Sequence, residues 1–282
     1  MEVSQLFGRP LAAVCAALVI SLNCAVAQPA KEPAKESAKD FEPQEGQAGK
    51  DVIWVPTSLG LVYKMLEAAN VTSDDYVIDL GSGDGRTVIT AAKRGAKAMG
   101  IEYNPDMVAL SQRNAAKEGV SDRATFMKAD LFESDFSQAT VITMFLLSDI
   151  NLRLRPKLLD MKPGTRIVSN TFGMGDWEAD ANIQASTGCQ RYCSGHYWVI
   201  PAKVAGTWRL PQGELKLEQK YQKVSGTLKS KSGTAKVSGS LKGDQLTFTA
   251  GKMEYVGRVN GNTIEGTFKT TAKQSWRATR GK

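Results

Sequence analysis

Three acidic residues and one glycine-rich segment carry most of the chemical information in this 282-residue sequence. Asp79, Glu102 and Asp130 each follow a short apolar run that is typical of a buried strand. Three glycines lie within residues 81–85, directly after the first of these acids. The carboxyl ends of parallel strands meet at one edge of a sheet, where ligands bind. We therefore expect the three carboxylates to surround one ligand site.

The segment "VIDLGSGDGRT", residues 77–87, alternates glycines with other residues immediately after the first strand. Glycine lowers stability in regular structure, so this cluster indicates that a ligand approaches the backbone closely. Glu102 lies 21 residues after Gly81, a spacing that suits a carboxylate accepting both ribose hydroxyls of an adenosine. The alternative is an ordinary tight turn between a strand and a helix.

The charges around the glycines narrow the choice of nucleoside ligand. The dinucleotide pattern requires a third glycine where this chain has Arg86. Asp79 and Asp84 would repel a pyrophosphate, whereas they would attract a ligand that carries an ammonium and a sulfonium. S-adenosylmethionine is such a ligand. A nicotinamide or flavin oxidoreductase stays open as an alternative function, and so does an exported binding protein on the same scaffold.

Three motifs resemble those of class I S-adenosylmethionine-dependent methyltransferases. "DLGSGDG", residues 79–85, is similar to their D-x-G-x-G-x-G motif, and "GIEYNP" is similar to their second motif. "KADLF" resembles the third, which would place Asp130 at the adenine amino group and the Leu131 backbone beside the ring. The resemblance covers about residues 51–202.

A closer resemblance is to the small protein-lysine methyltransferases whose mitochondrial members modify the adenine nucleotide translocase and the ATP synthase c-subunit. It rests on "WVPTSLGLVYKML", "VIDLGSGDGRTVITAAK", "GIEYNPDMV", "RPKLLDMKPGTRIVSNTF" and "DWEAD". The resemblance implies that Trp54, Pro56 and Thr57 lie over the methionine end of the cofactor. It also implies a lysine of a protein as the methyl acceptor, with membrane proteins among the candidates.

These arguments give a set of site residues and a mechanism. In-line displacement needs no metal, because the sulfonium is already activated and the protein mainly positions the acceptor. Asp149, after the fourth strand, could take up or orient the acceptor proton; capping the next helix is its alternative role. The expected cofactor-binding residues are Thr57, Asp79, Gly81, Ser82, Gly83, Gly85, Glu102, Asn104, Asp130 and Leu131.

The N-terminal region precedes any folded domain. Residues 1–27 combine an apolar run with an A-x-A cleavage site, which is typical of a signal peptide and predicts export to the periplasm. An uncleaved anchor in the inner membrane, with the enzyme facing the cytosol, is the alternative. Residues 28–50 are rich in Pro, Ala, Lys and Glu and are predicted to be a disordered linker.

The region after the linker divides into two patterns. Residues 51–202 alternate strands with helices of about ten residues, which predicts an α/β Rossmann-like domain with a mostly parallel, doubly wound sheet. Residues 203–282 show short alternating runs with turn signals, which predict an all-β meander of seven or eight strands, closed or nearly closed into a small barrel.

The predicted β-domain carries most of the positive charge. Residues 203–282 hold 16 Lys and Arg and 5 Asp and Glu, a net charge of +11 in a chain with a total of +7. Such charge favours an anionic partner surface, and nucleic acid is not favoured as the partner here; a solvated face is the alternative. Whether the domain binds a ligand or only docks or stabilises stays open.

Two cysteines would remain after removal of the N-terminal segment. Cys189 and Cys193 stand in "CQRYC", and they could form a local disulfide in an oxidising compartment or stay as free thiols. A metal site would need more ligands than these and the single histidine, His196.

Overall fold

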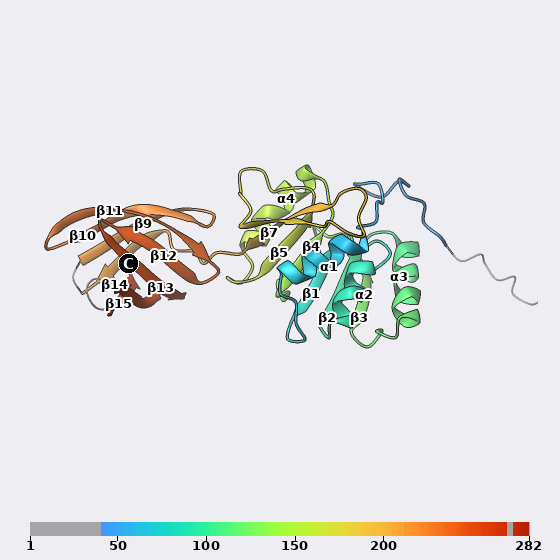
Figure 1. Ribbon diagram of the computed structural model, residues 1–282, viewed down its shortest axis with the longest axis horizontal. Coiled ribbons are helices and arrows are strands. Elements are labelled where there is room, and N and C mark those ends of the chain that lie inside the picture. The colour runs from blue at the N-terminus through green and yellow to red at the C-terminus, as the bar shows by residue number, and fades with distance from the viewer. Residues whose placement is uncertain (1–40, 212, 270–272, 282) are drawn as a thin grey trace, which may run out of the picture. The chain divides into compact units, whose positions relative to one another are not determined.

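The computed structural model describes residues 41–211, 213–269 and 273–281. The predicted signal peptide and most of the predicted linker lie outside the described residues. The chain from Phe41 onward contains an α/β sheet domain followed by a barrel (Figure 1). No helix among the described residues is both long and apolar enough to cross a membrane.

A seven-stranded mixed sheet forms the first domain, in the order β3-β2-β1-β4-β5-β7-β6. The first five strands are parallel, and β7 runs antiparallel to both β5 and β6. The order reverses direction between β1 and β4, which is the position where such sheets bind ligands. The strands are β1 (Tyr76–Leu80), β2 (Lys97–Glu102), β3 (Ala124–Lys128), β4 (Val141–Met144), β5 (Arg166–Asn170), β6 (Ala181–Gln184) and β7 (Ser194–Val199).

Helices cover both faces of this sheet, as the alternating pattern predicts. Val77 of β1 packs with α1, α2 and α3 in one apolar cluster, whereas its neighbour Ile78 packs with α4 in another. Both faces of the central strand are therefore buried, which explains its continuous apolar run. The helices are α1 (Leu59–Ala68), α2 (Arg86–Lys93), α3 (Pro105–Lys117) and α4 (Ser148–Leu159).

The helix starts follow local capping chemistry. The Ser58 hydroxyl accepts from the Leu61 N–H at the start of α1, and the Asn104 side chain accepts from the Asp106 N–H at the start of α3. The sequence predicts a helix from Asn151 that breaks near Pro163–Gly164, whereas α4 begins three residues earlier, at Ser148, and ends at Leu159.

The edge of the sheet differs from the predicted one. The sequence predicts one late strand over residues 197–202, but the structure has the antiparallel pair β6 and β7. In β6 only Ile183 is buried, so its four residues carry too little apolar pattern to predict a strand.

The second domain is a closed antiparallel barrel of eight strands, which confirms the predicted meander. Closure comes from pairing of the last strand with β8, a strand whose range the sequence pattern did not predict. Trp208, Phe248, Tyr255 and Trp276 help fill the interior. The strands are β8 (Gly206–Leu210), β9 (Gly213–Lys220), β10 (Lys223–Ser230), β11 (Gly233–Lys242), β12 (Gln245–Ala250), β13 (Met253–Asn260), β14 (Thr263–Lys269) and β15 (Lys273–Arg280).

Candidate active site

The glycine-rich loop after β1 is held in one backbone conformation. The N–H groups of Gly81 and Ser82 donate to the Ile101 carbonyl at 2.9 and 3.1 Å. Gly81 and Gly83 have φ of 75° and 54°, a region that favours glycine. From α3, the Ser111 hydroxyl donates to the Gly83 carbonyl at 2.8 Å. The loop is therefore fixed by its neighbours before any ligand arrives.

Glu102, at the end of β2, is oriented toward this loop by two backbone groups. One carboxylate oxygen accepts from the Gly83 N–H at 2.9 Å, and the other accepts from the Asn104 N–H at 3.0 Å. Each oxygen keeps a lone pair for a further donor. Glu102 is half-buried and lines the cavity beside the loop, so its carboxylate fits the two hydroxyls of a ribose.

Asp79 is the buried acid of the site, with a relative exposure of 6%. The Thr143 hydroxyl donates to it at 2.6 Å. Burial raises the pKa of Asp79 to about 7, because the Thr143 hydrogen bond opposes the shift only in part and the nearby Glu102 and Asp84 carboxylates add to it. A cationic ligand group in the cavity would favour the ionised form. Asp84, by contrast, is already ion-paired with Arg86.

Asp130, after β3, is engaged by a lysine in this structure. The Lys50 ammonium donates to one carboxylate oxygen and lies 4.7 Å from the centroid of the Tyr103 ring. The other oxygen accepts from the Phe132 N–H at 2.9 Å. The Lys50 ammonium and this N–H hold the pKa of Asp130 below its usual range. An adenine amino group that binds Asp130 would therefore compete with Lys50.

Residues 44–57, here named the N-terminal strap, run along the cavity. Within it, the Gly46 N–H donates to the Trp54 carbonyl and the Trp54 N–H donates to the Gln47 carbonyl, both at 2.9 Å. Thr57 is anchored at the far end, where its hydroxyl accepts from the Asn170 amide at 3.1 Å. The sequence assigns residues 44–50 to the linker, but the structure places them in the strap. These residues are held by backbone hydrogen bonds and carry no apolar pattern, so the sequence does not predict that they are ordered.

The cavity brings together nine of the ten expected cofactor-binding residues. They are Thr57, Asp79, Gly81, Ser82, Gly83, Glu102, Asn104, Asp130 and Leu131. Gly85 lies outside the lining: it is the residue directly before α2, and a Cβ there would lie 2.8 Å from the Phe126 ring. Its conformation thus serves packing of the loop against β3.

Asp149 is also outside the cavity lining. It is exposed in the first turn of α4, where its negative charge interacts favourably with the helix dipole. Its catalytic role stays a prediction. The lining includes four residues that the sequence reasoning missed, Lys50, Tyr103, Phe172 and Tyr192. Tyr103 lies within the "GIEYNP" motif, whereas Lys50, Phe172 and Tyr192 come from separate segments that no local motif connects with the glycines.

The donor set of this cavity fits S-adenosylmethionine. A carboxylate for the ribose hydroxyls, a carboxylate at the adenine position and a buried acid beside a glycine loop suit a cationic nucleoside. The family model of the ANTKMT methyltransferase domain matches residues 79–181. A protein-lysine N-methyltransferase of Saccharolobus islandicus is 46% identical over 140 residues, which are 49% of this chain and 87% of that protein.

The chain belongs to the ANTKMT methyltransferase family. It is an S-adenosylmethionine-dependent methyltransferase, as the glycine loop and its acids predict. A solved structure of an RNA methyltransferase from Salinibacter ruber, in complex with S-adenosyl-L-homocysteine, is 43% identical with a TM-score of 0.50. That likeness covers 53% of this chain and 96% of the other.

A eukaryotic relative matches a smaller share of the chain. The human lysine N-methyltransferase named for the ATP synthase c-subunit is 38% identical over 105 residues. The match covers 37% of this chain and 45% of the human protein, so the chain spans less than half the length of that relative.

Proposed function

We propose that the acceptor of this methyltransferase is a lysine side chain of a protein. The observation that carries the proposal is the 46% identity to a protein-lysine N-methyltransferase over 87% of that protein. The composition of the cavity supports it as well. Beyond the glycine loop the lining includes Phe145, Phe172 and Tyr192, an aromatic surface suited to an alkyl amine.

The reaction needs positioning more than acid–base power. S-adenosylmethionine supplies a methyl group on a sulfonium that leaves as a neutral thioether. The glycine loop and Glu102 would hold the nucleoside, and Asp79 would hold the cationic amino-acid end. A lysine amine attacks only when neutral, so apolar surroundings that lower its pKa assist the transfer. The aromatic part of the lining provides such surroundings.

Methyl transfer from labelled S-adenosylmethionine tests the acceptor class. Total protein from a lysate, heated to inactivate its own enzymes, would serve as the substrate, with Glu102→Ala as the control enzyme. We expect label that resists nuclease, is lost with protease and is recovered as methyl-lysine after acid hydrolysis. The Salinibacter neighbour is called an RNA methyltransferase. Label that nuclease removes would therefore support an RNA acceptor and contradict the proposal.

We further propose that the basic barrel brings the enzyme to an anionic surface. Its net charge of +11 supports this, since attraction to such a surface is screened by salt. The test is sedimentation of the full chain with vesicles of anionic or neutral lipid. We expect binding to the anionic vesicles that weakens with salt, and a weaker response when Lys229, Lys231 and Lys236 are replaced by Glu. Equal binding to neutral vesicles would contradict the proposal.

We propose export as the localisation of this chain. The predicted A-x-A cleavage site supports it, and so does the Cys189–Cys193 disulfide, because such bonds persist in oxidising compartments. A phosphatase fused after the N-terminal segment should be active only if that part is exported. An inactive fusion would favour an enzyme that faces the cytosol.

A further inference from the structure

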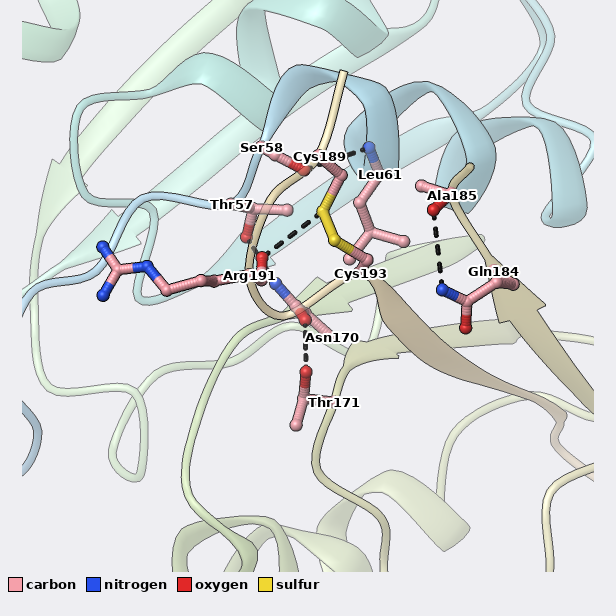
Figure 2. Close-up of a disulfide and its surroundings, with 10 residues drawn as sticks. All are labelled: Thr57, Ser58, Leu61, Asn170, Thr171, Gln184, Ala185, Cys189, Arg191 and Cys193. Carbon is pink, nitrogen blue, oxygen red and sulfur yellow. Dashed lines mark hydrogen bonds between the residues drawn. A yellow bond between two sulfur atoms is a disulfide. The ribbon is translucent and has the colours of Figure 1, made fainter. Parts of the chain in front are cut away.

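The loop between β6 and β7 is closed by a disulfide beside the start of α1. Residues 185–193, here named the disulfide loop, contain the Cys189–Cys193 bond, with the two Cα atoms 5.7 Å apart. The Ala185 N–H donates to the Cys193 carbonyl at 2.8 Å, which closes the base of the loop. Figure 2 shows the disulfide next to Ser58 and Leu61. Cys189 packs against the apolar cluster that includes Leu61.

Two contacts tie this loop to elements that border the cavity. A Cβ on Gly60 would lie 2.1 Å from the Thr187 carbonyl oxygen, so the loop backbone touches the first turn of α1. Arg191 forms an ion pair with Glu45 of the N-terminal strap. The loop thus contacts both segments that flank Thr57, a residue of the cavity lining.

A third contact reaches the cavity itself. The Tyr192 ring meets the Phe145 ring edge-on with centroids 5.3 Å apart, and Phe145 stacks with Phe172 at 6.1 Å. All three side chains line the cavity; together they are named the aromatic wall. Tyr192 has a φ of 54°, a conformation that is costly for a non-glycine residue. The next residue, Cys193, is held in the disulfide.

The strand order places the aromatic wall away from the adenosine end. Glu102 ends β2 and Asp130 follows β3, and both strands lie on one side of β1 in the sheet. Phe145 and Phe172 follow β4 and β5 on the other side, and Tyr192 precedes β7 beyond them. A nucleoside held by the two acids would therefore direct its reactive end toward the wall.

We propose that the Cys189–Cys193 disulfide positions Tyr192 so that the aromatic wall receives the acceptor lysine. This inference rests on the proposed lysine acceptor. Aromatic faces bind the alkyl chain and the ammonium of a lysine, and they offer little solvation to it. A dithiol that reduces the disulfide gives two electrons and two protons to form two thiols, and is itself oxidised to a disulfide. Reduction frees the loop and weakens acceptor binding, while the cofactor residues stay in place.

Steady-state methyl transfer to heated lysate protein tests the proposal. We expect Tyr192→Ala to lower kcat/KM for protein by about tenfold, and Tyr192→Phe to retain most of it because the ring remains. Dithiothreitol should lower the wild-type activity similarly, and it should not change a Cys189→Ser, Cys193→Ser double variant that is already impaired. Affinity for S-adenosylhomocysteine should stay within about twofold throughout.

Two results would overturn the inference. One is full activity of Tyr192→Ala or of the reduced enzyme; the other is an equal loss of S-adenosylhomocysteine binding, which would assign Tyr192 to the cofactor site. Hydrogen exchange gives a readout that does not depend on the acceptor. Reduction should speed exchange in residues 185–193 and leave β1 unchanged, and unchanged exchange in the loop would contradict the positioning role. A wild-type enzyme that transfers no methyl to protein would instead contradict the lysine acceptor.

Discussion

The pKa of Asp79 makes cofactor binding depend on pH in a range that is easily measured. With a pKa of about 7, roughly one carboxyl in eleven is ionised at pH 6 and about ten in eleven at pH 8. If the amino group of S-adenosylhomocysteine binds only the ionised form, affinity rises about tenfold over this interval. Binding at pH 6.5 should also release a proton, because the bound cation lowers the pKa of Asp79.

Calorimetric titration at several pH values measures both effects. Titrations in two buffers with different ionisation enthalpies give the number of protons released. Asp79→Asn should bind weakly, with neither the pH dependence nor the proton release. A wild-type affinity that is flat from pH 6 to pH 8, with no proton released, would refute the reasoning about Asp79. The raised pKa also affects stability, because ionising the buried Asp79 destabilises the ligand-free fold. The free energy of unfolding without ligand should therefore fall as pH rises from about 4 to about 7.

Three further substitutions test other contacts. Lys50→Met should bind S-adenosylhomocysteine up to about fivefold more tightly at low salt, because the exposed ion pair between Lys50 and Asp130 no longer competes with the adenine amino group. An unchanged calorimetric affinity would contradict this. Gly83→Ala should weaken binding about tenfold or more, since its Cβ would lie 2.7 Å from Trp54 Nε1 at a φ of 54°; wild-type affinity would refute it. Asp75→Asn should cost about 2 kcal/mol in urea unfolding at pH 7. Burial alone would raise the pKa of Asp75, but hydrogen bonds from a backbone N–H, a hydroxyl and an arginine together hold the pKa below its ordinary value. The stability difference between the wild type and Asp75→Asn should therefore vanish as the pH falls below the ordinary pKa of an aspartate.

Much of the fold follows from local sequence patterns. The glycine loop, the acids at the ends of β1, β2 and β3, and the alternating barrel strands each have a signal within a few residues. The signals fail where structure depends on distant partners. β6 pairs only with β7 in the sheet order, and β8 is defined by its pairing with β9 and with the last strand, β15.

The candidate site divides in the same way. The nucleoside half comes from one motif and its spacing, so Asp79 and Glu102 could be predicted. The acceptor half is assembled from separate segments. Tyr192 reaches the cavity from a loop that packs on α1. In the nucleoside half, Lys50 likewise reaches Asp130 from a distant segment, the N-terminal strap. Residues 44–50, which include Lys50, carry no apolar pattern that distinguishes them from a solvated linker.

One calorimetric titration tests the central claim, that the cavity at the glycine loop is the cofactor site. S-adenosylhomocysteine would be titrated at pH 8 into the full chain and into Glu102→Ala, whose folding is checked by thermal unfolding. We expect binding in the micromolar range by the wild type and its loss in the variant, because Glu102 is the residue predicted to accept both ribose hydroxyls. Equal binding by the two proteins, or none by a folded wild type, would contradict the account.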